Sequence, residues 1–221
     1  MLSDAHAHLY RYSPEDLNGT VRRSEKSKVK IALIAGVDLE TSIKTVDIAA
    51  NYDLVYACVG VHPWYADTFN DIVYEKLRNL AKENRVVAIS ETGLDFVRRR
   101  DYVYSTSFVK GHLPKEIQRK AFISQIKLAK ETKLPLIIHE NSSHIEILEI
   151  LRQEDASKIG GAIHGFVGDL KTAEQYLELG FYISIGKRAI WSVLFDPDRT
   201  SSLRRVIEEA PIEKLLSLIH I

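Results

Sequence analysis

Five side chains of metal-binding type stand at the ends of apolar segments in the sequence. His6 and His8 flank one alanine at the end of the first segment, and Glu91, His139 and His164 each end a later one. Residues two apart on a strand face the same way, so the first two imidazoles can converge on one cation. Neutral imidazole and carboxylate are ligands for zinc and similar divalent ions. One pair alone would be weak evidence, but five such residues on four predicted strands indicate a shared metal site.

The same set is large enough for two divalent ions. Glu91 could bridge them, with His6 and His8 on one ion and His139 and His164 on the other. Paired ions roughly 3.5–4 Å apart hold the attacking and leaving oxygens of a phosphoryl transfer and generate hydroxide near neutral pH. One carboxylate among four neutral imidazoles leaves the ion pair strongly positive. This charge favours an anionic phosphodiester substrate over an amide.

Two candidate substrate-binding residues follow another predicted strand end. His62 could hydrogen-bond a substrate phosphate, and Trp64 could stack on a base. A purely structural His62 is the alternative. Asp95, four residues after Glu91, is better suited to fixing the loop or a ligand imidazole than to binding metal.

These residues need a scaffold that brings strand ends together, and the sequence predicts one. Short apolar runs alternate with amphipathic helical patterns along the chain, and several runs are apolar on both faces, as in covered parallel strands. The expected strands are Leu2–His8, Ile31–Gly36, Leu54–Gly60, Val86–Glu91, Pro135–His139, Gly161–His164, Phe181–Ile185 and Leu215–Ile219. The expected helices are Leu39–Ala50, Tyr74–Asn84, Pro114–Thr132, His144–Gln153, Leu170–Gly180 and Ser201–Glu209.

Strand, helix, strand, repeated along the chain, predicts right-handed crossovers and an α/β fold of the (β/α)8 TIM-type barrel rather than an open sheet. In such a barrel the carboxyl ends of the strands surround a common centre. No linker rich in Gly, Ser or Pro divides the chain, so residues 1–221 are expected to form a single metal-dependent hydrolase barrel domain. The longest irregular stretch, Phe96–Leu113, contains Arg98–Arg100 and is expected to be a long loop at the catalytic mouth.

Composition and charge exclude several classes of protein. The chain is 45% hydrophobic and 27% charged, the balance of a soluble globular protein. Its 30 basic residues match 30 acidic ones, so the chain has no net charge of the kind that marks proteins that coat nucleic acids or bind membrane surfaces. Cys58 is the only cysteine, which excludes an intrachain disulfide and fits a reducing compartment. With no signal-peptide pattern and no apolar run long enough to span a bilayer, we expect a cytoplasmic or nuclear monomer without a membrane partner.

Together the motifs resemble the TatD family of metal-dependent deoxyribonucleases, within the wider amidohydrolase-like barrel group. The similarity runs from the first residues to about Leu216. The matching segments are His6-x-His8 after Asp4, Gly60-Val61-His62-Pro63, Glu91-Thr92-Gly93-Leu94-Asp95, Gln118-x-x-x-Phe122, Gln125-x-x-Leu128-Ala129, Leu134-Pro135-x-x-Ile138-His139 and His164-Gly165-Phe166.

The resemblance implies hydrolysis of DNA phosphodiester bonds by a metal-activated water, commonly from a strand end, as in an exonuclease. It implies two divalent ions, which could be Mg²⁺, or alternatively Zn²⁺ or Mn²⁺. His6 and His8 would hold the first ion, and His139 and His164 would hold the second. Glu91 would bridge the two ions as the catalytic carboxylate, and DNA would be the partner.

Three departures from the family pattern bear on these expectations. Ser90 stands where the family usually has glycine, and Asn141 stands where an arginine is often found. The family's eighth strand normally ends in Glu-Thr-Asp or Glu-Ser-Asp, followed by Ala-Pro. Here Glu213–Ile221 lacks that motif, and in ungapped register His220 takes the place of the Asp. We therefore expect an incomplete last β/α unit, one catalytic carboxylate fewer and impaired activity.

Two alternatives to a deoxyribonuclease stay open. A barrel hydrolase could act on amides or esters, because the same ions polarise carbonyl groups. A non-catalytic protein could keep the site only to bind metal or nucleic acid. Turnover of an amide or ester would favour the first alternative, and DNA affinity without turnover would favour the second.

Overall fold

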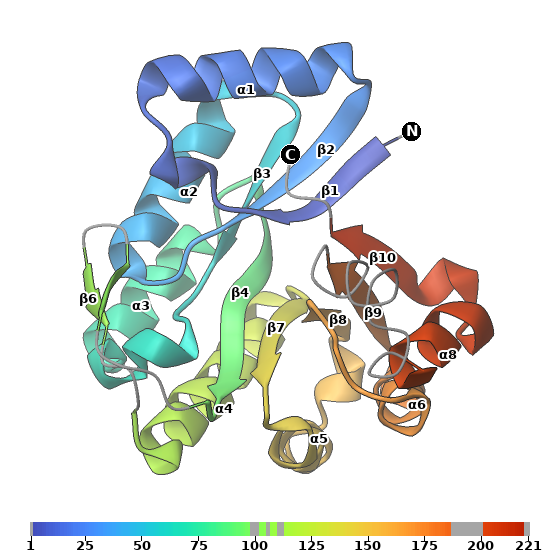
Figure 1. Ribbon diagram of the computed structural model, residues 1–221. Coiled ribbons are helices and arrows are strands. Elements are labelled where there is room, and N and C mark those ends of the chain that lie inside the picture. Colours follow the sequence, from blue (N-terminus) through green and yellow to red (C-terminus); the bar gives the residue numbers. More distant parts are fainter. Residues whose placement is uncertain (1, 98–101, 105–106, 110–112, 187–200, 219–221) are drawn as a thin grey trace.

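Eight parallel strands form a nearly closed barrel with helices around its outside in the computed structural model (Figure 1). The structure describes residues 2–97, 102–104, 107–109, 113–186 and 201–218. Within these residues the strand order is β1-β2-β3-β4-β7-β8-β9-β10, and β10 lies beside β1. The predicted α/β fold, a (β/α)8 TIM-type barrel, is confirmed.

The helices and strands alternate as the apolar pattern predicts. The barrel strands are β1 (Leu2–Ala7), β2 (Val29–Ala35), β3 (Val55–Val59), β4 (Val86–Asp95), β7 (Leu136–Asn141), β8 (Gly161–His164), β9 (Phe181–Gly186) and β10 (Leu215–Leu218). The α-helices are α1 (Pro14–Lys26), α2 (Leu39–Asn51), α3 (Asp71–Leu80), α4 (Lys115–Thr132), α5 (His144–Gln153), α6 (Leu170–Glu178) and α8 (Ser201–Glu209). Short 3-10 helices are η1 (Leu9–Arg11), η2 (Pro63–Thr68), η3 (Ala156–Lys158) and η4 (Ile212–Lys214). None of the described helices has both the length and the apolar character needed to cross a membrane.

Side-chain caps fix where several helices begin. The Ser13 hydroxyl accepts the Asp16 backbone N–H at 3.2 Å at the start of α1. Asp38 and Thr41 form a reciprocal capping box at the start of α2. Such caps satisfy backbone donors that the first helical turn leaves open. The crossovers are therefore set locally, close to the strand ends that carry the site.

Helix α1 was not expected from the sequence. Only Leu17 and Val21 are apolar on its buried face, which it shares with Thr20 and Ser24, so few apolar residues mark the helix. The stretch Phe96–Leu113 was expected to be a long irregular loop, and it does connect β4 to α4, but the expectation that it is irregular throughout was wrong. It contains an antiparallel pair, β5 (Tyr102–Tyr104) and β6 (Ser107–Val109). Both are too short to leave a clear alternation in the sequence.

Strands β4 and β7 run past their predicted ends, so Glu91 and His139 lie inside strands rather than at their last residues. Gly93 explains the extension of β4. A Cβ at this position, where φ is +142°, would lie 2.0 Å from the His139 carbonyl oxygen. Only glycine permits this close approach, which lets β4 pair with β7 as far as Asp95. Arg98–Arg100 and His220 lie outside the described residues.

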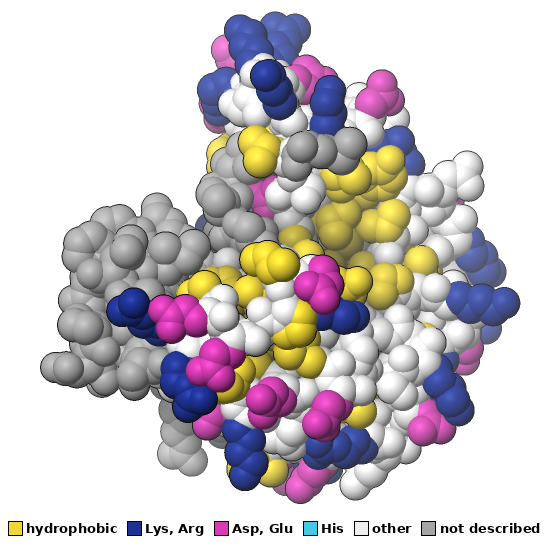
Figure 2. Space-filling model, turned by 90° about the vertical axis from the view of Figure 1, so that its right-hand side faces the viewer, with side chains coloured by type: hydrophobic (Ala, Val, Ile, Leu, Met, Phe, Trp, Pro, Cys, Tyr) yellow, Lys and Arg dark blue, Asp and Glu magenta, His cyan; other side chains and the backbone are white. Residues whose placement is uncertain are grey.

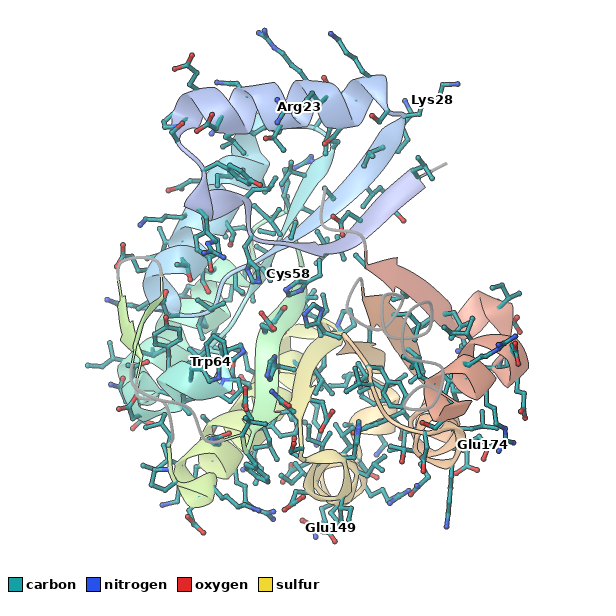
Figure 3. All side chains as sticks on the ribbon, viewed as in Figure 1. Arg23, Lys28, Cys58, Trp64, Glu149 and Glu174 are labelled. Carbon is teal, nitrogen blue, oxygen red and sulfur yellow. The ribbon has the colours of Figure 1, made fainter. Side chains whose placement is uncertain are left out.

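Two apolar layers position the strands. The larger one lies between the barrel and its helices and includes the fully buried Ile34, Phe122 and Tyr176. The smaller one lies among the strands and includes Cys58, a small buried residue on β3. Burial raises the pKa of the Cys58 thiol to about 12, and Figure 3 shows this residue among the barrel strands.

The barrel is hollow toward the starts of its strands. A cavity of about 580 Å³ is lined by Leu33, Tyr56, Ile137, Ala162 and Tyr182, together with other mostly apolar side chains. Figure 2, which views the molecule from the right-hand side of Figure 1, shows hydrophobic side chains gathered around a hollow. His164 also lines this hollow, whereas His6, His8, Glu91 and His139 lie beyond it toward the strand ends.

Candidate metal centre

Four strands bring the five predicted metal ligands together around one buried carboxylate. Glu91 of β4 is only 4% exposed. Its oxygens lie 3.3 Å from His6 Nε2, 3.5 Å from His8 Nε2, 3.0 Å from His139 Nδ1 and 3.6 Å from His164 Nε2. The convergence at the carboxyl ends of the strands is the arrangement that the strand positions predict. The role of these residues as ligands stays a prediction.

The first group consists of His6, His8 and Glu91, whose potential ligand atoms all lie within 4.8 Å of one another. His8 Nδ1 lies 3.0 Å from the Ala35 carbonyl oxygen, which can only accept, so Nδ1 carries the proton. The lone pair of His8 Nε2 then faces His6 Nε2 at 3.2 Å and the Glu91 carboxylate. Two imidazole nitrogens and a carboxylate oxygen that converge in this way match the ligand set of a divalent cation.

The second group lies on the other oxygen of Glu91. His139 Nδ1 faces this oxygen, while His139 Nε2 lies 3.2 Å from Asp95 Oδ2. A proton on Nε2, donated to Asp95, leaves Nδ1 free for a cation. Asp95 therefore contacts an imidazole of the centre, as expected, while the role of His139 as a ligand stays a prediction. His164 is partly exposed, and its buried Nδ1 has no hydrogen-bond partner among the described residues.

His62 also reaches this second group, with its Nε2 3.8 Å from Glu91 Oε1. His62, Glu91 and His139 form another possible ligand set by distance. However, His62 Nδ1 accepts the Trp64 backbone N–H at 3.1 Å, so the neutral ring carries its proton on Nε2. This tautomer makes His62 a hydrogen-bond donor toward the centre, and His164 is the more suitable ligand.

Trp64 closes one side of the centre beside β4 (Figure 3). Its Nε1–H donates to Asp95 Oδ2 at 2.9 Å, and its ring centroid lies 4.3 Å from that of His62. Asn141, which stands at the family's frequent arginine position, donates weakly to the same Asp95 oxygen at 3.5 Å. The link from Trp64 to Asp95 spans 31 residues, and no local pattern in the sequence reports it. Asp95 thus joins the predicted substrate side of the centre to the metal side.

The charges in the centre depend on mutual contacts. Burial by itself would raise the pKa of Glu91, but His6 and His139 outweigh it and hold the pKa of Glu91 well below its ordinary value. Burial, and then the neighbouring His139, hold the pKa of His62 well below its ordinary value. Burial, followed by His6, does the same to the pKa of His164. The carboxylate is therefore ionised and these two imidazoles are neutral, which is the protonation that metal binding requires.

His139 differs from the other imidazoles. Burial lowers its pKa, but hydrogen bonds to Asp95 and Glu91 prevail and raise the pKa of His139 to about 9. Without a cation, this ring holds a proton between two carboxylates. A cation at Glu91 and His139 would have to displace that proton. Donor chemistry, tautomers and charge in this centre all fit divalent ions.

His144 lies outside this centre and makes other contacts. Its Nε2 is 3.1 Å from Glu140 Oε2, and its Nδ1 is 3.3 Å from the Tyr176 hydroxyl. Glu140 also accepts the Ser143 backbone N–H at 2.7 Å. These contacts join α5 to α6 behind the strand that carries His139.

Sequence and structure comparisons point to one family. The family model described as TatD related DNase matches residues 3–217. The metal-dependent hydrolase YabD of Bacillus subtilis is 32% identical over 217 residues, which covers 98% of this chain and 78% of that protein. The 3'-5' ssDNA/RNA exonuclease TatD of Cronobacter sakazakii is 33% identical over 201 residues, which covers 91% of this chain and 70% of that protein.

A solved structure agrees with these sequence matches. The crystal structure of the TatD homologue YjjV from Escherichia coli K12 matches with a TM-score of 0.79 at 28% identity. The match covers 97% of this chain and 77% of that one. Similarity in sequence and in fold therefore extends over nearly the whole described barrel.

Proposed function

The chain belongs to the TatD family of metal-dependent hydrolases, and from this premise we propose that it hydrolyses DNA phosphodiester bonds with two divalent ions. The observation that carries the proposal is the position of Glu91, with one pair of imidazoles beside each of its two oxygens. Divalent ions bound in such a centre activate water and offset the negative charge of a phosphodiester.

His6, His8 and one Glu91 oxygen would hold the first ion. His139, His164 and the other oxygen would hold the second. An imidazole-rich set favours Zn²⁺ over Mg²⁺, and Mn²⁺ is intermediate in its ligand preference. Glu91 is the catalytic carboxylate of the proposal, because its ionised form ties the two ligand groups together.

His62 and Trp64 are the proposed substrate-binding residues. The neutral His62 ring directs an N–H toward the centre, where it can donate to a phosphate oxygen. The half-buried indole of Trp64 stands next to it and is anchored at its edge by Asp95, so its face is the part suited to base stacking. A donor and an aromatic face side by side favour a nucleotide over a simple amide.

The name of the Cronobacter relative supports a nuclease that acts from a strand end. We therefore propose an exonuclease, with DNA as the substrate. Hydrolysis of an amide or ester, and binding without hydrolysis, are the competing outcomes of the experiment below.

The proposal is tested by cleavage of end-labelled single- and double-stranded DNA with Mg²⁺, Mn²⁺ or Zn²⁺. The comparison is between the unaltered chain, Glu91→Ala, and the surface control Glu149→Ala, which lies exposed on α5 (Figure 3). We expect the unaltered chain and the control to shorten the end-labelled DNA, and Glu91→Ala to leave it intact. A panel of amides and esters is assayed in parallel.

Turnover of an amide or ester but not of DNA would replace the nuclease with the other hydrolase. Folded, metal-loaded protein that binds DNA and cleaves nothing would leave only a binding function. Equal cleavage by Glu91→Ala would contradict the proposed centre itself.

A further inference from the structure

Two glutamines on α4 are buried although neither belongs to the proposed metal centre. Gln118 and Gln125 are 2% and 1% exposed, although glutamine is mostly found at protein surfaces. They are seven residues apart, which places them on one face of the helix about 10 Å from each other along its axis. Both belong to the glutamine motif singled out in the sequence.

Gln125 binds the backbone just before His62. Its Oε1 accepts the Val61 N–H at 2.7 Å, and its Nε2 donates to the Val61 carbonyl at 2.9 Å. One side chain thus satisfies both polar groups of Val61, as a neighbouring strand would do. Because β3 ends at Val59, this segment has left its regular sheet pairing.

The same segment is held from the other side by α2. The Ser42 hydroxyl accepts the Gly60 N–H at 3.1 Å and lies 3.2 Å from the Gly60 carbonyl oxygen, to which it donates. A Cβ on Gly60 would lie 2.3 Å from the Ser90 carbonyl oxygen and 2.9 Å from Gln125 Oε1. Glycine is therefore required for the close approach of this backbone to both β4 and Gln125.

Gln118 binds the backbone of Asp95 in the same manner. Its Oε1 accepts the Asp95 N–H at 2.8 Å, and its Nε2 donates to the Asp95 carbonyl at 3.0 Å. The Asp95 carboxylate in turn contacts His139 Nε2 at 3.2 Å. Gln118 therefore acts through Asp95 on His139 and also on Trp64, whereas Gln125 acts through Val61 on the segment that carries His62, the proposed phosphate donor.

We propose that Gln118 and Gln125 are positioning residues that hold the His139 ligand and the His62 donor at a fixed separation across the centre. The proposal rests on the proposed function, which assigns His139 to the metal and His62 to a substrate phosphate. A single helix carries both glutamines, so the spacing between the two sides follows from two helical turns rather than from a flexible loop. A purely structural role would instead affect both sides equally.

The test compares Gln118→Leu and Gln125→Leu by two titrations, one with Mn²⁺ and one with inorganic phosphate added to the Mn²⁺-loaded protein. Gln118→Leu should bind Mn²⁺ about 10-fold more weakly, the size of effect expected when the partner of a ligand imidazole is disturbed. Gln125→Leu should keep its Mn²⁺ affinity and bind phosphate about 10-fold more weakly, since only the His62 side moves. On DNA, the same variant should raise KM more than it lowers kcat.

Ile126→Val is the matched control, because Ile126 is fully buried beside Gln125 on α4 and makes no contact of this kind. It should lower thermal stability without changing either titration. If a leucine variant does not fold, Gln118→Asn and Gln125→Asn replace it, since they keep an uncharged amide but shorten its reach; each should show the same selectivity to a smaller degree.

Equal losses in both titrations for both glutamine variants would overturn the proposal, as would unchanged titrations in folded variants. Both titrations can be read without hydrolysis. A chain that binds Mn²⁺ and phosphate with the expected selectivity but cleaves no DNA would refute the nuclease and keep the positioning role. A chain that binds no Mn²⁺ would overturn both.

Discussion

The two ends of the barrel bury their side chains in different ways. At the strand ends, one carboxylate and its surrounding imidazoles are buried together, and each depends on its neighbours for charge compensation. At the strand starts, Leu33, Tyr56 and Ile137 line an apolar hollow. Buried charge is costly unless it is paired, whereas apolar burial needs no partner. Changes at the first end should therefore alter ion binding and chemistry, while changes at the second should alter stability alone.

The largest expected effect comes from removing the charge of Glu91. Glu91→Gln keeps the shape of the side chain but takes away the carboxylate that both ligand groups share. We expect Mn²⁺ affinity to fall by roughly 1,000-fold, since a bridging ligand is lost rather than an outer contact, which costs about 10–100-fold. Calorimetric titration measures the loss, and Glu149→Gln on the surface should show none.

The next effect is the pH dependence of ion binding. The pKa of His139 is about 9 in the metal-free centre, above its ordinary value of 6.5, so a cation must displace a proton at neutral pH. Mn²⁺ affinity should therefore rise by up to about tenfold per pH unit from pH 7 and level off near pH 9. A flat profile over this interval would show that the His139 proton does not compete with the cation.

The same proton affects the stability of the metal-free protein in the opposite direction. Because the folded pKa of His139 exceeds the unfolded value, its contribution is complete below pH 6.5 and is lost as the pH rises through about 9. With chelator present, the free energy of unfolding should fall over this interval by roughly 1–3 kcal/mol. Urea titrations at several pH values check the sign.

A smaller effect is expected at His62, which faces the centre but is not a proposed ligand. His62→Ala should weaken phosphate binding by roughly 10- to 150-fold, because a donor to a charged acceptor is worth roughly 1.5–3 kcal/mol. Its Mn²⁺ affinity should stay unchanged. The control His144→Ala removes an imidazole that contacts Glu140 and Tyr176 instead, so it should change neither. Loss of Mn²⁺ affinity in His62→Ala would instead make His62 a ligand.

The smallest effect is expected at the strand starts. Ala162 lines the hollow, and Ala162→Val adds apolar volume to it on a β-branched side chain. Thermal or urea unfolding should show a gain of about 0.5–1 kcal/mol, as is common for cavity filling. DNA cleavage and Mn²⁺ affinity should not change. A change in either would mean that the two ends of the barrel are coupled.

The sequence contained enough to predict the barrel and the convergence of its polar residues. Strand β8 was predicted with its observed bounds, because the two apolar residues Ala162 and Ile163 lie between a glycine pair and a histidine and leave little ambiguity. His6 and His8 were assigned to one face by strand alternation alone. These successes rest on local period and on the rule that parallel strands end at a common rim.

The remainder depends on contacts between distant residues. The extension of β4 to Asp95 follows from the close approach of Gly93 to the His139 backbone, 46 residues away in sequence. The bonds from Gln125 to Val61 span 64 residues. The sequence assigned His164 to the metal and His62 to the substrate, but the tautomer that supports this division depends on the Trp64 N–H, which no sequence pattern reports. Neither periodicity nor composition carries such information.

Cys58 makes opening of the barrel directly measurable. It is the only thiol in the chain, it is fully buried, and β3 pairs with β2 and β4 on either side of it. A thiol reagent can reach it only when these strands separate, so the labelling rate reports the frequency of that opening. Cations that join β1, β4, β7 and β8 should slow the labelling in proportion to their occupancy. The labelling rate of Cys58 therefore measures how strongly ions bound at the strand ends reduce opening of the barrel.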